Sequence, residues 1–159
     1  MNSIHASCVT FGLVGVLIRG DPGSGKSSLC LRLVDSVGFG LGSTALGAML
    51  VADDQTQLRL SAGHVIASAP PALAGKLEIR GLGIITVPFA ADTWVRLVVD
   101  LVAAEGSVRM PEIEALWVEL CGVRLPRLMI HAAEADAAAK VRAALGHFGL
   151  SVGLQNASI

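Results

Sequence analysis

The sequence predicts an α/β domain in which a central sheet is flanked by helices, and three observations support this. Residues 13–19 form an apolar, β-branched run, a glycine-rich segment follows, and residues 28–35 have the pattern of a helix start. Hydrophobic residues make up 53% of the 159-residue chain and charged residues 16%, which indicates a densely buried sheet. We expect one domain over residues 1–149 and a flexible tail over 150–159.

The glycine-rich segment, residues 20–27, has the sequence GDPGSGKS and fits every fixed position of the phosphate-binding loop G-x-x-x-x-G-K-[ST]. Its glycines allow positive φ angles, so successive N–H groups can surround a phosphate at a helix N-terminus. Lys26 adds a positive charge, and the Ser27 hydroxyl suits Mg²⁺. A glycine turn that only joins a strand to a helix is the alternative. The expected nucleotide-binding residues are Gly20, Asp21, Pro22, Gly23, Ser24, Gly25, Lys26 and Ser27.

Two adjacent carboxylates, Asp53 and Asp54, follow a predicted buried strand over residues 48–52. In open parallel sheets ligands bind outside the carboxyl ends of the strands, so this pair should face the same crevice as the phosphate-binding loop. One carboxylate could accept a hydroxyl proton or position Mg²⁺ while the other orients its neighbours. An ordinary acidic turn is the alternative.

Glu78 and Arg80 lie two residues apart in residues 77–87, so an extended chain would present them on one face. They could supply a carboxylate to Mg²⁺ and a guanidinium to a phosphate. A surface ion pair that contributes little to stability is the alternative.

The other segments have simpler patterns. The glycine density of residues 37–47 predicts a flexible loop, and residues 57–68 alternate around a polar turn as a hairpin does. Residues 1–7 have the composition of an irregular start, apart from His5 ahead of the first strand. Three later segments have regular patterns: a strand over 94–102, an edge strand over 123–130 that Pro126 interrupts, and an amphipathic helix over 132–148.

Charge and composition argue against some partners. The net charge of −1 gives no electrostatic reason to expect nucleic acid or an anionic membrane. Charged residues interrupt every apolar run well short of the ~20 residues of a membrane span. No secretory signal is visible, and the three cysteines lack metal-ligand spacing, which fits a reducing compartment. We therefore expect a soluble, cytoplasmic protein, and the high apolar fraction favours a homo-oligomer.

Taken in order, the phosphate-binding loop, LVADD (residues 50–54) and LEIRGLGII (residues 77–85) resemble the catalytic domain of HPr kinase/phosphorylase. That enzyme phosphorylates a serine of the phosphocarrier protein HPr of the sugar phosphotransferase system. The resemblance runs from about residue 5 to residue 88 and is closest to the short form without the N-terminal domain. It implies a P-loop-containing HPr kinase-like fold with a central mixed sheet, ATP and Mg²⁺ as cofactors, an HPr-type protein as substrate, and a hexamer.

The resemblance also implies a role for each residue that matches a motif. Asp54 would accept the serine proton, Asp53 would be its partner, and Lys26 would bind the transferring phosphate. Ser27 and Glu78 would hold Mg²⁺. The implied catalytic residues are Asp54, Lys26, His5, Asp53 and Arg80.

The sequence departs from the family pattern at Pro22, Ser28 and Gln55, where the family commonly has Ser, an acidic residue and Arg. The family's later glycine-arginine stretch, tied to dephosphorylation, has no clear counterpart, and Arg124 and Arg127 are only nearby substitutes. The expected function is an ATP- and Mg²⁺-dependent protein serine kinase acting on HPr. The alternatives are a nucleotide-gated regulatory module without phosphoryl transfer and a small-molecule kinase.

Overall fold

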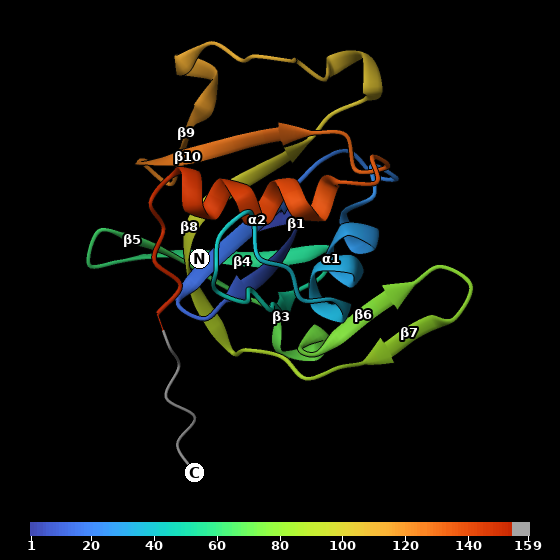
Figure 1. Ribbon diagram of the computed structural model, residues 1–159. Coiled ribbons are helices and arrows are strands. Elements are labelled where there is room, and N and C mark those ends of the chain that lie inside the picture. Colours follow the sequence, from blue (N-terminus) through green and yellow to red (C-terminus); the bar gives the residue numbers. More distant parts are fainter. Residues whose placement is uncertain (154–159) are drawn as a thin grey trace.

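The computed structural model describes residues 1–153, which form one mixed eight-stranded sheet, a separate two-stranded hairpin and two α-helices (Figure 1). The strands of the large sheet are β1 (Asn2–Phe11), β2 (Val14–Arg19), β3 (Met49–Ala52), β4 (Gln55–Ser61), β5 (His64–Ser68), β8 (Asp92–Leu101), β9 (Trp117–Leu120) and β10 (Val123–Ile130). The hairpin consists of β6 (Lys76–Ile79) and β7 (Gly83–Thr86). The helices are α1 (Lys26–Asp35) and α2 (Ala137–His147), with short 3₁₀ turns η1 (Pro71–Leu73), η2 (Ala104–Gly106) and η3 (Ile113–Leu116).

The strand order of the large sheet is β2-β1-β4-β5-β8-β10-β9, and β3 also pairs with β1. Because β2 pairs with β8 as well as with β1, the strands β2, β1, β4, β5 and β8 close a ring. The β2–β8 and β8–β10 pairs are parallel and the other pairs are antiparallel. The predicted central mixed sheet is therefore confirmed.

The irregular start expected over residues 1–7 is wrong, because residues 2–7 belong to strand β1. Residues 6–11 pair with β2 and residues 2–5 pair with β4, while residues 8–10 also pair with β3. The polar residues Asn2, Ser3 and His5 are exposed, whereas Ser7 is buried and donates its hydroxyl to the carboxylate of Asp53. Ser7 is buried although it is polar, because it has a hydrogen-bond partner, which lies 46 residues away in the chain. The segment therefore lacks the run of apolar residues by which a buried strand is recognised in a sequence.

The edge strand expected over 123–130 is β10, which lies between β8 and β9 and not at the edge. Its residues 127–130 pair with β8, and residues 123–126 pair with β9. Pro126, which has no N–H to donate, is the last residue paired with β9, where β10 changes partners.

The two faces of the sheet have different coverings. Apolar side chains of β2 (Val14, Val16 and Ile18) pack with both helices in one core cluster. A second cluster, which includes Leu17 from the opposite face of β2, contains strand and loop residues and no residue of α1 or α2. Figure 1 shows α2 lying across one face of the sheet with α1 beside it. The helices therefore cover one face of the sheet.

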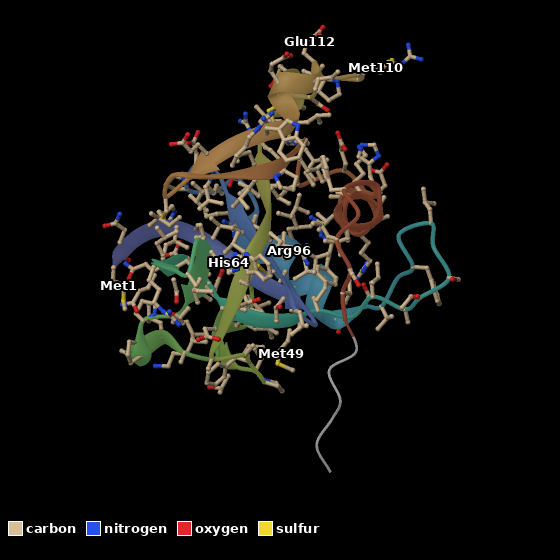
Figure 2. The ribbon with its side chains drawn as sticks, turned by 90° about the vertical axis from the view of Figure 1, so that its left-hand side faces the viewer. Met1, Met49, His64, Arg96, Met110 and Glu112 are labelled. Carbon is tan, nitrogen blue, oxygen red and sulfur yellow. The ribbon has the colours of Figure 1, made fainter. Side chains whose placement is uncertain are left out.

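Three peripheral parts complete the fold. The β6–β7 hairpin projects beside α1 (Figure 1), and the segment between β8 and β9 projects from the opposite side, with Met110 and Glu112 near its tip (Figure 2). Of the tail expected over 150–159, Leu150 and Val152 pack against the helix-side core. Residues 154–159 lie outside the described residues. No helix in the described part of the chain is long and apolar enough to cross a membrane.

Candidate active site

Strand directions bring the predicted site residues to one end of the sheet. β1 runs antiparallel to both β2 and β3, so the carboxyl ends of β2 and β3 lie beside Ala6 and Cys8, near the middle of β1. The phosphate-binding loop follows β2, Asp53 and Asp54 follow β3, and His5 precedes Ala6 on β1. Asp54 and the phosphate-binding loop thus meet at one end of the sheet, through an antiparallel strand between β2 and β3 and not through the expected open parallel sheet. The Asp53 side chain, expected to face the same crevice, is buried instead.

A cleft of about 450 Å³ opens at this end. Its lining residues are His5, Pro22, Gly23, Gly25, Lys26, Ser27, Ser28, Leu31, Asp54, Glu78, Ile79 and Arg80. Of the predicted site residues, Gly20, Asp21, Ser24 and Asp53 lie outside this lining. All lining residues come from the first 80 residues of the chain.

The phosphate-binding loop has the backbone that its glycines predict. Gly23 and Gly25 have φ angles of 80° and 98°, and a Cβ at Gly25 would lie 2.8 Å from the Cβ of Ala132. Lys26 is buried, and its Nζ donates to the carbonyls of Gly20 (2.9 Å) and Asp21 (3.1 Å). The loop thus holds its only lysine folded over its own backbone.

The N-terminus of α1 is open to an anion. Helix α1 begins at Lys26 after Gly25, and no side chain in the described part of the chain caps its first N–H groups. Those N–H groups have no acceptor within the helix, and the helix dipole favours negative charge there. A phosphate is the group that such a terminus accommodates best.

Ser24 also suits a bound group. Its Oγ is the buried side-chain polar atom without a hydrogen-bond partner among the described residues. A Cβ at Gly20 would lie 2.4 Å from that oxygen, so only glycine leaves room for this arrangement of the loop. Buried hydroxyls normally have a partner, and a phosphate oxygen could supply one.

Asp53 is buried and joins three elements of the site. Its carboxylate accepts hydrogen bonds from Ser7 Oγ (2.8 Å), Ser27 Oγ (2.8 and 3.0 Å) and the backbone N–H of Glu78 (3.2 Å). Ser7 was missed from the sequence, although the apolar run that follows it could have indicated a buried strand. Asp53 therefore connects β1, α1 and β6 rather than standing beside Asp54 as a second exposed carboxylate.

Asp54 has a different environment from its neighbour. Its φ angle is 65°, a left-handed conformation that Asp tolerates better than most residues. Its side chain is 61% exposed, and its Oδ1 lies 3.3 Å from Nδ1 of His5. Its backbone N–H donates to Ser7 Oγ (3.1 Å), so Ser7 holds both carboxylate residues. The chain thus presents Asp54 to the cleft on a constrained backbone.

Glu78 and Arg80 both reach the cleft, but Arg80 does not lie within the strand as an extended 77–87 segment predicts. It occupies the turn between β6 and β7, where Leu82 N donates to Ile79 O (2.9 Å). Among residues 1–153 no group of three or more His, Cys, Asp and Glu could hold a metal ion. A magnesium ion here would depend on phosphate oxygens and water in addition to side-chain oxygens.

Arg124 and Arg127 lie outside the cleft. The Arg124 guanidinium stacks over the Trp117 ring at 4.8 Å. Arg127 donates to Asp100 (2.6 Å), which also accepts two hydrogen bonds from Arg19 (2.7 and 2.8 Å). Burial raises the pKa of Asp100, but the hydrogen bonds and charges of both arginines outweigh it and lower that pKa below its ordinary value. Neither residue replaces the arginine stretch that the family resemblance implies.

Comparison with known proteins agrees with this geometry. The profile of a family described as HPr Serine kinase C-terminal domain matches residues 1–148. An HPr kinase/phosphorylase from Clostridium tetani is 39% identical over 85 residues, which cover 54% of this chain and 25% of that protein. One from Lacticaseibacillus casei is 39% identical over 107 residues, covering 62% and 30% of the two chains. The chain thus matches less than a third of the length of these relatives.

A solved structure covers more of the chain. The HPr(Ser) kinase/phosphatase from Coxiella burnetii is similar with a TM-score of 0.73 and 25% sequence identity, over 94% of this chain and 90% of that one. The family profile and this structure both extend beyond the segment that carries the sequence motifs, into β8, β10 and α2. The chain belongs to the HPr serine kinase C-terminal domain family.

Proposed function

We propose that this chain is an ATP- and Mg²⁺-dependent protein serine kinase that phosphorylates an HPr-type phosphocarrier protein. The observation that carries the proposal is the single cleft that combines an open phosphate-binding loop with a presented carboxylate, Asp54. Phosphoryl transfer needs positioning and charge neutralisation more than covalent catalysis, and these parts supply both.

Asp54 is the proposed proton acceptor. The substrate serine would give its hydroxyl proton to this carboxylate while its oxygen bonds to the γ-phosphorus and the bond from that phosphorus to ADP breaks. His5, 3.3 Å from Asp54 Oδ1, would orient the carboxylate. The constrained backbone of Asp54 reduces the number of positions that the carboxylate can take, which favours a defined attack geometry.

Lys26 and Arg80 are the proposed cations for the phosphates. Among the described residues, Lys26 Nζ bonds only neutral carbonyls, which a phosphate oxygen can replace as a stronger, charge-assisted acceptor. Arg80 is exposed on the β6–β7 turn and lines the cleft. Together with the N–H groups at the start of α1, they would neutralise charge on the transferring group.

Oxygen donors fit magnesium at the base of the cleft. Ser27 and Glu78 are the proposed ligands, and Asp53 would orient the Ser27 hydroxyl that it now accepts from. Bound magnesium would neutralise phosphate charge. The remaining ligands would be phosphate oxygens and water, as magnesium commonly retains.

The protein substrate would approach over the β6–β7 hairpin, whose exposed Leu82 and Ile84 lie beside Arg80 in the sequence. We further propose a cytoplasmic homo-oligomer, hexameric by family resemblance. The proposal covers the kinase direction. One domain over residues 1–149 would carry the activity.

The test is labelled phosphate transfer from ATP to purified HPr in the presence of Mg²⁺. We expect wild type to transfer and both Lys26→Ala and Asp54→Asn to lose about 10²-fold or more. Asn tolerates a positive φ, so Asp54→Asn should remain folded and still bind ATP. Transfer by Asp54→Asn at a near-normal rate would contradict the assignment.

Asp92→Asn is a matched control for Asp54→Asn. Asp92 has a similarly exposed side chain, 57% against 61%, and it also lies 3.3 Å from a basic partner, here Arg59. It is not among the residues that line the cleft. Asp92→Asn should transfer phosphate at the wild-type rate, so a loss there would point to a general effect of surface charge.

A nucleotide-gated module without transfer is the second candidate. One observation favours it: no arginine from the second half of the described chain lines the cleft. A folded wild type that binds ATP tightly but transfers nothing to HPr would support this candidate. Transfer to a small hydroxylated molecule instead of HPr would favour a small-molecule kinase.

A further inference from the structure

A second cavity of about 580 Å³ lies at the opposite end of α1 from the candidate active site. It is bounded by the glycine-rich loop after α1, the carboxyl-terminal end of α2 and residues 150–153. Its larger apolar lining residues are Phe39, Leu46, Leu145, Leu150 and Val152. It shares no residue with the first cleft, and the proposed kinase reaction makes no use of it.

A buried guanidinium belongs to this lining. Arg142 of α2 is 4% exposed. Its Nε donates to the carbonyl of Leu46 (3.1 Å), and its Nη2 donates to the carbonyls of Leu33 (3.3 Å) and Ser36. No hydrogen bond to a described residue involves Nη1. Among the described residues, the fully buried side-chain polar atom without a hydrogen-bond partner is Ser24 Oγ. Nη1 of Arg142 is therefore not fully buried and remains accessible to solvent.

The positive charge of Arg142 has no counter-ion among residues 1–153. None of the ion pairs in this part of the chain includes Arg142, and its three acceptors are neutral carbonyls. Burial lowers the pKa of Arg142 below its ordinary value, without a compensating effect from a neighbouring carboxylate. A buried guanidinium is usually paired with an anion, so this one has an unmet preference.

The glycine-rich loop, which forms another wall of the cavity, packs closely on Arg142. The glycine-rich loop is closed at its base by Gly38 and Leu46, which bond in both directions (3.4 and 2.7 Å). A Cβ at Gly40 would lie 2.5 Å from the carbonyl of Arg142, so the loop backbone rests on the helix backbone. A cavity with an apolar wall and a few polar groups has the character of a ligand site.

We propose that this cavity binds a small organic anion, with its oxyanion head group on the Nη1 side of Arg142 and its apolar body against Phe39 and Leu145. A carboxylate and a phosphate monoester share the required chemistry, because each presents oxygens that accept from a guanidinium. Octanoate and octyl phosphate are suitable probes for the two sources. 1-Octanol has the same apolar body without the charge.

Calorimetric titration of the full chain with each probe tests the proposal. We expect at least one of the two anions to bind at least about tenfold more tightly than 1-octanol. Octyl phosphate could also enter the phosphate-binding loop, so a variant must identify the site. Gly146 of α2 borders the cavity, and a Cβ there would meet nothing within 4 Å. Gly146→Leu should fill the cavity without strain and weaken the anion about tenfold or more.

Ala139→Leu is the matched control, because residue 139 is exposed two turns earlier on α2 and outside the cavity. It should bind the anion as wild type does. Arg142→Met, where circular dichroism shows it folded, should bind octanoate and 1-octanol alike. The proposal is overturned if neither anion binds, if 1-octanol binds as tightly as both anions, or if Gly146→Leu binds them like wild type.

Discussion

The backbone polar groups at the two ends of helix α1 differ in whether the protein supplies their hydrogen-bond partners. At its N-terminus, Gly25 supplies no capping side chain and the first N–H groups face the cleft. At its C-terminus, Ser36 donates both its N–H and its hydroxyl to Arg32 O, and Arg142 donates to Leu33 O and Ser36 O. One end is left for a ligand and the other is satisfied by the protein.

This difference separates catalysis from stability within one short helix. Unpaired backbone groups at a helix end cost free energy unless a partner supplies the hydrogen bonds. At the cleft end that partner would be a phosphate, so changes there should affect binding and transfer. At the Arg142 end the partner is already in the chain, so changes there should affect the free energy of unfolding.

The largest expected effect is a loss of phosphate transfer at the cleft end of α1, where the neighbours Asp53 and Asp54 should differ in their effect on stability. Asp53→Asn and Asp54→Asn should each reduce phosphate transfer about 10²-fold or more. Only Asp53→Asn should also lower the free energy of unfolding, by about 1–3 kcal/mol, because the buried carboxylate accepts from three groups. Urea denaturation measures the second effect. Equal destabilisation by both variants would show that the three hydrogen bonds to Asp53 do not stabilise the fold.

At the other end of α1, Arg142→Met should lower the free energy of unfolding by about 3 kcal/mol, because the backbone carbonyls of Leu46, Leu33 and Ser36 each lose a donor. Lys140→Met, on the same helix, is the control. Lys140 is 40% exposed and pairs with Glu134 and Asp136, so its loss should cost under about 1 kcal/mol. If both variants unfold at the same urea concentration, the contrast between the ends of α1 fails.

Two glycines of the phosphate-binding loop differ in how closely the surrounding residues pack around them, and this difference can be tested at the cleft end of α1. Gly23→Ala should cost about 1 kcal/mol, since its φ is 80° but nothing lies within 4 Å of a Cβ. Gly25→Ala adds a 2.8 Å contact with Ala132 to a φ of 98° and should cost about 2 kcal/mol. Thermal unfolding compares them. Equal costs would mean that the loop can shift away from Ala132.

The smallest expected effect concerns Asp100 and depends on pH. Its pKa is lowered in the folded protein, so its stabilising contribution is complete above the ordinary aspartate pKa of about 3.9 and declines as the pH falls below it. Asp100→Asn should cost about 1 kcal/mol at pH 7, because Asn still offers one acceptor to Arg19 or Arg127. The difference from wild type, measured by urea denaturation, should be constant from pH 5 to 7 and shrink below about pH 4. A difference that grows in acid would contradict the assignment.

Much of the fold and of the site could be predicted from the spacing of residues within short segments. The phosphate-binding loop needs its glycines, lysine and serine at fixed positions, so residues 20–27 were recognisable without tertiary structure. The strand before the loop and the helix after it have local apolar patterns, and both formed as β2 and α1. The hairpin at residues 57–68 formed as β4 and β5 for the same reason.

Residues whose partners are distant in the chain were harder to predict. The sequence does not indicate a strand over residues 2–7, because Asn2, Ser3 and His5 are polar and exposed and the buried Ser7 finds its partner, Asp53, 46 residues away. β10 was expected at an edge because Pro126 cannot donate, and the change of partner strand at that residue has no local signal.

The sequence by itself determined which residues could contact a phosphate, since that chemistry depends on side-chain type and short spacing. Only the tertiary structure decided that Asp53 is buried and Asp54 presented, because Ser7, Ser27 and Glu78 supply the hydrogen-bond donors from three separate elements. It also decided that Arg142 donates a hydrogen bond to the Ser36 carbonyl at the end of α1, from 106 residues away in the chain. Burial and hydrogen bonding are set by which segments meet, and the meeting of distant segments is a property of the whole fold.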